Sequence, residues 1–526
     1  MAKGLTRRQF TGLSVFTASA LAAPPVIACR EGNHPRLRIR RETDFTNFDP
    51  ADYHWEDEVI TRNVLAPLVR SRQKKGRAKS WEVVPHLATD WTSNGSATEI
   101  TFRIMDQPWR DIGDLTAEDV KYSFERIAGV NGHSLNAKQQ FAWENLEGVD
   151  VTGPRTVALR LKSSRPSLVQ DVLPWGAGCI VSKEACENMS GNRFQLDPGR
   201  SSGRYKITAL ERGSHLDLDC EENWKGEPVS IQKARFMVVH DDRVADALLA
   251  SGELDVMRAT PDVLFNRIAA FDRLRNIVGS DLQIADTPSS TVSYLAINSG
   301  PDRINAPEIR VAIQYAIEPK EVLASVYGGQ FGREASSFLP AHVEGAVRER
   351  ARPFDQTMAR ELLRDGGYDQ RELRLAYLPT SVNDVKAKAI AEQLNAVGLA
   401  IRLEPLGFPE LMDVLPDLDL ALLRVRASTL QPMDAARRFY RGPADSNRLA
   451  MGFSSAEYDE TFQAAQTELD LSKRLSLIET LQNLVYSDGA YVPIEDEQAT
   501  WLLKGAVPSF TPGGAIGDLG DWEFSN

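Results

Sequence analysis

Arg424, Arg426 and Ser428 stand two residues apart at the end of an apolar run. Alternate side chains of a β-strand point to the same face, so Arg424 and Arg426 share a face that Ser428 continues. The run predicts that they lie at the carboxyl end of a strand, where α/β sheets bind ligands. Two guanidiniums with a hydroxyl suit a carboxylate, a phosphate or an acidic sugar derivative. The alternative is an exposed edge, where these arginines pair with Asp417 or Asp419 in water.

Two aromatic residues flank a histidine at Tyr53-His54-Trp55, shortly after Pro50. The Tyr and Trp rings can stack on a ligand, and His54 can donate a hydrogen bond to an anion. The alternative is that both rings pack into a core beside the proline. The histidines of the chain are scattered, and no two have the spacing of a metal-binding helix or finger. We therefore expect neither a metal ion nor a cofactor.

The chain lacks the short motifs of common hydrolase and nucleotide sites. G-x-S-x-G, H-E-x-x-H, C-x-x-C and the P-loop pattern are all absent from the sequence. A glycosidase carboxylate pair is defined by its separation in space, so a hydrolase remains a lesser alternative. We expect a protein with no catalytic residues and no enzymatic activity.

The first residues have the pattern of an export signal. Arg7 and Arg8 precede an apolar run that is too short to span a bilayer, which is typical of a twin-arginine signal removed after export. We place this signal at residues 1–28. The run ends in a segment that resembles a lipobox, in which the thiol of Cys29 would carry lipid. Cleavage at the upstream A-x-A pattern would instead leave a soluble chain, so a soluble and a lipid-anchored periplasmic protein both remain open.

Composition and compartment together narrow the class of function. Outside the cytoplasm there is no pool of ATP or NAD, which excludes kinases and dehydrogenases. The net charge of -12 makes the chain a poor nucleic-acid binder. Its 526 residues can bury a large core and suggest roughly two to four domains. Beyond the signal, Cys179, Cys186 and Cys220 remain; a bridge from Cys179 to Cys186 and three buried thiols are both open.

The first half of the chain predicts hairpins with single helices. Residues 84–91 and 99–104 alternate in polarity around the turn at 93–95, and Thr116 with Asp119 forms a capping box that starts a helix. Segments 203–220 and 232–240 predict further strands, and 244–249 predicts a short helix that ends at Gly252.

The second half has a different rhythm, in which strands alternate with helices. Strands are predicted at 373–378, 399–403 and 418–425, with helices at 384–397 and 411–415 between them. This β-α-β-α-β order predicts a parallel sheet covered by helices on both faces. The chain therefore contains an α/β domain that differs from the part before it.

Eight sequence blocks, in this order, resemble the extracytoplasmic solute-binding proteins of peptide/nickel ABC importers, family 5. The blocks are PHLATDW at 85–91, TFRI at 101–104, LTAEDVKYSFERI at 115–127, SGRYKI at 202–207, LLASGELDV at 248–256, YLAIN at 294–298, EIRVAIQYAI at 308–317, and the segment 354–368 that ends in GGY. The resemblance spans about residues 36–505, which is nearly the whole exported chain.

The resemblance implies an α/β periplasmic binding protein fold of class II, in which a hinge joins two lobes. It implies a lobe 1 core of 33–54, 177–287 and 493–526, an extra subdomain at 55–176, and a second lobe at 288–492. The lobes would close on a small molecule or short peptide and deliver it to the permease and ATPase subunits of an ABC importer. We expect a monomer that binds no nucleic acid.

The resemblance also bears on the ligand. In peptide-binding members an Asp pairs with the α-ammonium of the ligand, and matching the segments places Ser428 at that position. A hydroxyl does not replace a carboxylate beside a buried cation. Asp434 in the next loop can restore amine binding, so a small peptide or peptide-like solute is the main prediction. An anionic solute, opine-like or an acidic sugar conjugate, is the alternative. The resemblance places Tyr53, His54 and Trp55 at the cleft.

Overall fold

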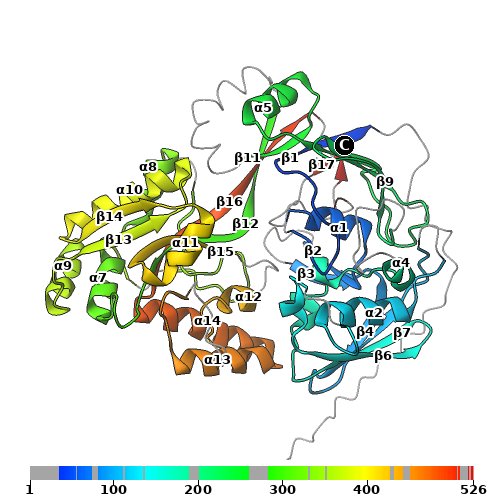
Figure 1. Cartoon of the computed structure of the whole chain (residues 1–526), viewed down its shortest axis with the longest axis horizontal. Coiled ribbons are helices and arrows are strands. Elements are labelled where there is room, and N and C mark those ends of the chain that lie inside the picture. The colour runs from blue at the N-terminus through cyan, green and yellow to red at the C-terminus, as the bar shows by residue number, and fades with distance from the viewer. Residues whose placement is uncertain are drawn as a thin grey trace, which may run out of the picture.

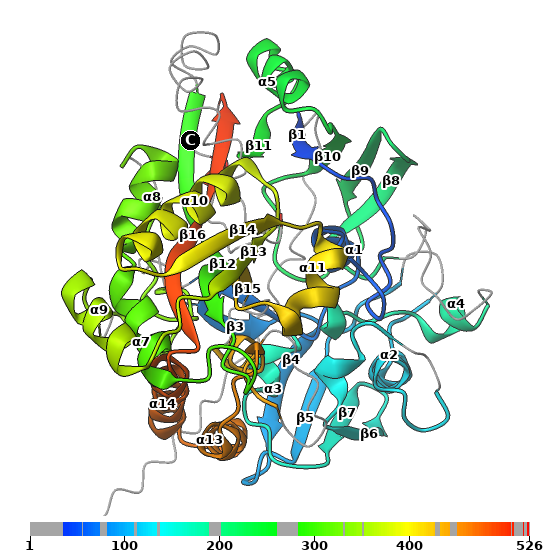
Figure 2. The same cartoon turned by 60° about the vertical axis from the view of Figure 1, so that its left-hand side comes forward.

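Two long strands run through the middle of the molecule and join its two lobes (Figure 1). In this computed structural model β12 (Leu282–Ile297) and β16 (Tyr491–Lys504) pair antiparallel over most of their length. Lobe 1 contains the elements before β12 and after β16, and lobe 2 contains the elements between them. Figure 2 shows the two strands side by side from another direction.

The structure describes residues 35–524 with gaps. The gaps are 55, 74–80, 110–112, 134–136, 189–200, 260–281, 330, 331, 350, 351, 427–431, 442–449, 506, 507, 510–518 and 520–522. The predicted export residues Arg7 and Arg8 and the predicted lipidation residue Cys29 lie outside the described residues, as do Trp55 and Ser428.

One ten-stranded sheet continues from lobe 2 into lobe 1, in the order β14-β13-β15-β12-β16-β11-β1-β10-β9-β8. The register of β12 on β16 shifts between Pro288 and Val292. On one side of this shift β12 pairs with β15 of lobe 2, and beyond it β16 pairs with β11 of lobe 1. The two strands are thus the connection about which the lobes can move, and the exact boundaries near 288 and 492 stay predictions.

Lobe 1 contains a separate antiparallel sheet, β4-β5-β7-β6, with a helix packed on it. Its strands are β4 (Ala88–Ser93), β5 (Glu99–Ile104), β6 (Leu146–Gly153) and β7 (Thr156–Leu161), and the helix is α2 (Ala117–Ala128). The predicted capping box is confirmed, because Asp119 Oδ2 accepts from Thr116 N at 2.8 Å. The strand predicted at 84–91 pairs with 99–104 as expected, but it is interrupted at residues 86 and 87. It divides into β3 (Trp81–Pro85) and β4, because the backbone N–H groups of residues 86 and 87 donate hydrogen bonds to the carbonyls of Leu68 and Pro67.

Lobe 2 confirms the predicted parallel sheet. β13 (Glu372–Tyr377) is parallel to both β14 (Ala400–Pro405) and β15 (Leu420–Arg426), with α10 (Ser381–Ala396) and α11 (Phe408–Val414) as crossovers. Along β15, Leu420 and Leu422 face one hydrophobic core, and Ala421, Leu423 and Val425 face the other. The sheet therefore has helices on both faces, as this almost unbroken apolar strand predicts.

The remaining elements complete the two lobes. In lobe 1 they are β1 (Arg36–Arg41), α1 (Glu58–Val64), β2 (Val69–Gln73), η1 (Gln140–Trp143), α3 (Leu168–Asp171), η2 (Gly176–Gly178), α4 (Lys183–Glu187), β8 (Tyr205–Glu211), β9 (His215–Cys220), β10 (Lys233–Val238), α5 (Asp242–Ser251), β11 (Val256–Ala259), β17 (Pro508–Ser509) and β18 (Glu523–Phe524). In lobe 2 they are α7 (Pro307–Ala316), α8 (Pro319–Tyr327), α9 (Gln356–Asp365), η4 (Leu415–Asp417), α12 (Pro432–Ala436), α13 (Ala456–Thr467) and α14 (Leu471–Asp488). None of the described helices is both long and apolar enough to cross a membrane.

The cysteines settle one open question. Cys179 and Cys186 are buried in the core of lobe 1 and form no disulfide, so the bridge considered between them is absent. Cys179 lies at a backbone bridge to Pro67, whereas Cys186 lies on α4, and each packs among apolar residues. Cys220 is buried in the same core.

Candidate binding cavity between the lobes

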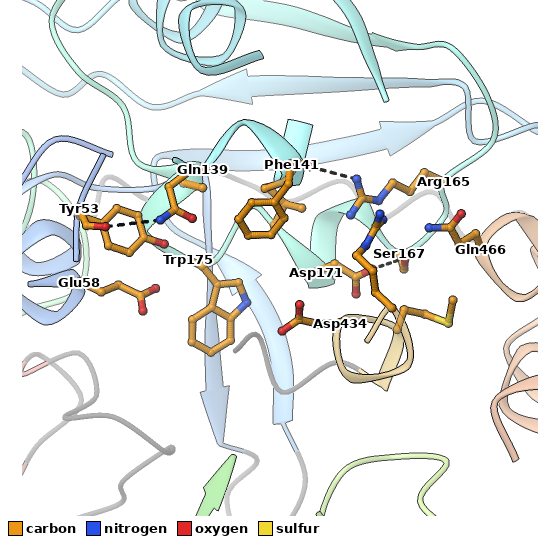
Figure 3. A pocket seen from close by; sticks show the side chains of 15 residues that line it. Tyr53, Glu58, Gln139, Phe141, Arg165, Ser167, Asp171, Trp175, Asp434 and Gln466 are labelled. Atoms are coloured by element: carbon orange, nitrogen blue, oxygen red, sulfur yellow. Dashed lines mark hydrogen bonds between the residues drawn. The ribbon is translucent and has the colours of Figure 1, made fainter. Parts of the chain in front are cut away.

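A cavity of about 230 Å³ lies where the lobes meet, and both lobes line it (Figure 3). Lobe 1 contributes Tyr53, Glu58, Gln139, Phe141, Ala142, Arg165, Ser167, Asp171, Val172, Trp175 and Ala177. Lobe 2 contributes Met433, Asp434, Arg437 and Gln466. This described lining combines aromatic rings with three carboxylates and two guanidiniums, so it can bind a polar solute that carries charge.

The aromatic part of the lobe 1 wall depends on a glycine. A Cβ atom at Gly176 would meet Cε1 of Tyr53 at 2.7 Å, so the absence of a side chain lets the ring lie against η2. Gly176 N donates to Glu58 Oε1 at 3.0 Å, which ties this turn to the first residue of α1. Burial, together with the Glu58 charge, raises the pKa of Tyr53, so its phenol stays protonated and able to donate.

Trp175 stands beside this glycine with its indole in the cavity wall. The guanidinium carbon of Arg62 lies 5.2 Å from the centre of its ring, a cation–π contact that fixes the plane of the ring. Its Nε1–H is buried and has no hydrogen-bond partner in the described structure. Figure 3 shows the carboxylates of Glu58 and Asp434 on either side of this ring. The ring can therefore support an organic cation or donate to a ligand acceptor.

Charged residues follow the aromatic ones along the lobe 1 wall. The Nη1 group of Arg165 donates to the carbonyl of Ala142 at 3.0 Å. Asp171, at the end of α3, accepts from Ser167 Oγ at 2.5 Å. Burial raises the pKa of Asp171, an effect that Arg165 and the serine oppose, and burial lowers the pKa of Arg165. Both charges are thus held in a poorly solvated place.

Lobe 2 closes the cavity with one short helix and with Gln466 of α13. α12 starts at Pro432, a residue suited to the first turn of a helix, and carries Met433 and Asp434 into the wall. Arg437 follows this helix and forms an ion pair with Glu144 of lobe 1, Nη2 to Oε1 at 2.8 Å. Ser164 Oγ of lobe 1 also donates to the carbonyl of Thr467 at 3.3 Å. The lobes thus touch beside the cavity.

The structure brings together two of the residues predicted to bind the ligand. Tyr53 and Asp434 come from opposite lobes and line the same cavity. His54 is exposed and is not among the lining residues. The roles of His54, Trp55 and Ser428 stay predictions. Within the described residues no group of His, Cys, Asp and Glu side chains is arranged to hold a metal ion.

The arginine pair is placed differently. Arg424 is half-exposed, is not among the lining residues, and donates from Nε to Glu497 Oε1 at 2.7 Å. Its expected alternative partners are engaged elsewhere, because Asp417 pairs with Arg303 and Asp419 pairs with Arg371. The alternative pairing of Arg424 with Asp417 or Asp419 is therefore wrong.

The partner of Arg424 lies on a distant part of the chain. Burial raises the pKa of Glu497, but Arg424, Lys386 and Arg258 outweigh that effect and lower it, so the carboxylate stays charged. Sequence patterns do not reveal this partner, since β16 lies two strands away from β15 in the sheet. For Arg426 the structure describes the backbone, which pairs with Thr291, and its ligand role stays a prediction.

Sequence reasoning did not find six charged or aromatic residues of the lining: Glu58, Phe141, Arg165, Asp171, Trp175 and Arg437. None belongs to a recognisable motif, because they come from α1, η1, the chain around α3, and the end of α12. The sole local signal is the bulky ring of Trp175 directly before a glycine, which favours a tight turn at a surface.

A family model described as bacterial extracellular solute-binding proteins, family 5, matches residues 82–447. The chain belongs to this family. The glutathione-binding protein GsiB of Salmonella paratyphi A is 21% identical over 518 residues, which cover 95% of this chain and 94% of the relative. The family is one of binding proteins, not enzymes.

Solved structures of the family show the same two-lobed fold. The ABC transporter substrate-binding protein CtaP of Listeria monocytogenes superposes with a TM-score of 0.79 at 19% identity, covering 94% of this chain and all of that one (100%). The periplasmic binding protein DppA of Helicobacter pylori, in complex with the peptide STSA, has a TM-score of 0.75 at 18% identity, covering 94% and 98%. The predicted class of α/β fold is thus confirmed.

Proposed function

We propose that this chain is the substrate-binding receptor of an ABC importer and that it captures a small peptide or peptide-like solute. The observation that carries the proposal is the cavity between the lobes, in which Asp434 of lobe 2 faces the aromatic wall of lobe 1. A ligand that touches both walls favours the closed arrangement, because closure then adds contacts that the open form lacks.

The amine of the solute is the group that Asp434 suits. A buried ammonium needs a counter-charge, and a carboxylate supplies it through charge-assisted hydrogen bonds. Glu58 and the rings of Tyr53 and Trp175 line the part of the cavity next to Asp434, which favours a cation there. Two relatives support a peptide ligand: GsiB is named for glutathione, and the DppA structure holds a peptide.

The alternative is an anionic solute without an amine, opine-like or an acidic sugar conjugate. Three carboxylates and two guanidiniums line the described cavity, and Arg437 is already paired with Glu144. This balance favours a solute that brings at least one positive charge. A purely anionic solute would bring its charge close to these three carboxylates, which repel it.

Delivery completes the proposed role. The twin-arginine pattern at Arg7 and Arg8 supports export to the periplasm, either as a soluble monomer or with lipid on Cys29. The closed form would then be recognised by the permease and ATPase subunits in the membrane, and no nucleic acid takes part.

Native mass spectrometry of the exported protein, purified under mild conditions, tests this proposal. We expect one equivalent of a small amine-bearing solute, released chemically unchanged on unfolding. Calorimetry with that solute should give one-to-one binding, and small-angle scattering should show compaction when it binds. Steady consumption of the solute, or binding without any compaction, would contradict the receptor role.

A further inference from the structure

The two guanidiniums of the cavity wall differ in their partners. Arg437 forms an ion pair with Glu144 at 2.8 Å, so its charge is neutralised within the protein. Arg165 donates from Nη1 to the neutral carbonyl of Ala142 at 3.0 Å. Among the described residues, no carboxylate lies within ion-pair distance of Arg165, and its Nε and Nη2 have no protein acceptor. Arg165 therefore faces the cavity without a close ion-pair partner, and Asp171, Glu144 and Asp434 act on its charge only from farther away.

Arg165 is also held firmly in place. Its backbone N–H donates to the carbonyl of Ala97 at 3.1 Å, and its own carbonyl accepts from Leu168 N at 3.2 Å, at the start of α3. The Ala142 carbonyl, on η1, orients the guanidinium from a third segment. A donor that is oriented before the ligand arrives loses little entropy on binding.

The surroundings give Arg165 little solvation. Burial lowers its pKa, and the charge of Asp171 only partly opposes this effect. Asp171 itself uses one oxygen to accept from Ser167. A guanidinium in such a place is unfavourable unless an anion joins it, and planar guanidinium groups match carboxylates with two parallel hydrogen bonds.

We propose that Arg165 binds a carboxylate of the solute and so selects a zwitterion. This inference rests on the proposed function and adds the second end of the ligand. Figure 3 shows Arg165 and Gln466 at one end of the cavity, and Glu58 with Trp175 at the other, with Asp434 between them. The amine lies near Asp434 and the carboxylate near Arg165. The cavity of about 230 Å³ is smaller than the range of about 300–1,000 Å³ that drug-sized ligands need, so the solute has the size of a short peptide.

Paired probes that differ in one terminal group test this proposal. Alanyl-alanine, alanyl-alaninamide, N-acetyl-alanyl-alanine and glutathione are titrated by calorimetry into the full exported chain and into Arg165→Gln. We expect the wild type to bind the dipeptide acid about 30-fold more tightly than its amide, as for a desolvated charge pair. In Arg165→Gln that preference disappears because the acid alone weakens. Arg160→Gln is the matched control, since Arg160 lies on β7 and pairs with Asp150 at the surface.

A structural role of Arg165 would produce a different result. We expect the ligand-free melting temperature of Arg165→Gln to stay the same or rise, because a partly buried charge without an ion-pair partner is removed. If that variant does not fold, Arg165→Lys replaces it. Lysine keeps the charge but loses the planar fork, so the preference for the acid shrinks without vanishing.

The outcomes separate this inference from the proposed function. If the wild type binds the acid and the amide equally, or Arg165→Gln binds the acid as tightly as the wild type, the carboxylate site is wrong while peptide capture stands. If neither alanyl-alanine nor glutathione binds the wild type, the peptide function fails, and the inference fails with it. Loss of binding by the N-acetyl probe alone would show independently that the free amine of the solute is recognised.

Discussion

The two walls of the cavity are built differently. The lobe 1 wall combines aromatic rings with charges that contacts inside that lobe hold in place, such as the turn at Gly176 and the carbonyl that orients Arg165. The lobe 2 wall depends on α12, a helix of 5 residues, and on Arg437 behind it. The comparison suggests a preformed platform on lobe 1 and a small closing element on lobe 2. Ligand contacts to the second wall are then the ones that drive closure.

The largest expected loss of ligand affinity follows a change in α12, the closing element of lobe 2. Asp434→Asn should weaken binding of an amine-bearing solute by about 30-fold or more, because a buried ammonium loses its counter-charge. Calorimetry with the co-purified solute measures this change. Asp413→Asn on α11 is the matched control, since Asp413 is exposed and outside the cavity lining. Equal affinities of Asp434→Asn and the wild type would show that lobe 2 supplies no ionic contact.

The lobe 1 wall should lose stability when a side chain is added to its packed turn. Gly176→Ala places a methyl group 2.7 Å from the ring of Tyr53, so the ring or the turn must move. We expect the free energy of unfolding to fall by about 1–3 kcal/mol, as for other overpacked sites, with weaker ligand binding as a consequence. Urea denaturation of the ligand-free protein checks the first effect. Gly95→Ala, in a turn with open space around it and without a left-handed φ, is the control that adds the same methyl group without a steric contact. An unchanged denaturation midpoint for Gly176→Ala would mean that the platform is not preformed.

A smaller effect is expected where the two walls meet. Arg437→Ala removes the ion pair with Glu144, whose side chains are 30% and 51% exposed. Pairs this exposed contribute at most about 1 kcal/mol, so affinity should fall by no more than about 5-fold, with faster release of the solute. Stopped-flow fluorescence measures the release rate. Arg303→Ala breaks a similar pair, with Asp417 inside lobe 2, and should leave release unchanged. A release rate equal to that of the wild type in Arg437→Ala would show that this contact does not hold the lobes together.

The smallest effect on binding is expected for Arg424→Ala. Arg424 lies outside the described cavity lining and pairs with Glu497, which the change leaves buried without that partner. We expect affinity to change by less than about 2-fold, whereas thermal stability falls because a buried carboxylate loses a hydrogen-bonded partner. Differential scanning calorimetry and ligand titration measure the two quantities. A large loss of affinity at unchanged stability would return Arg424 to the ligand site.

Much of the fold could be predicted because its signals are local. The capping box at Thr116 and Asp119 needs residues only three positions apart, and the apolar run of β15 shows that both faces of its strand are covered. The strand expected at 84–91 was the exception. Alternating polarity continued across His86, but its backbone hydrogen bonds lead to another segment, which no local pattern reveals.

The candidate site was less accessible to prediction. Residue type indicated that Tyr53 and Asp434 could bind a ligand, and both line the cavity. Arg424 and Arg426 share a face of their strand, which indicated an anion site. In the structure Glu497, 73 positions further along the chain, accepts a hydrogen bond from the Arg424 guanidinium. Arg165 carries no motif, and its importance rests on the absence of a protein counter-charge in the described structure.

The sequence by itself determined the family, the two kinds of architecture in the two halves of the chain, and the pattern expected of an export signal, because each rests on order and spacing along the chain. Only the tertiary structure decided which charges are paired and which face the cavity. Ion pairs form between side chains that folding brings together, and the energy of a charge depends on its distance from a counter-charge and from water. The sequence alone gives neither of these two distances.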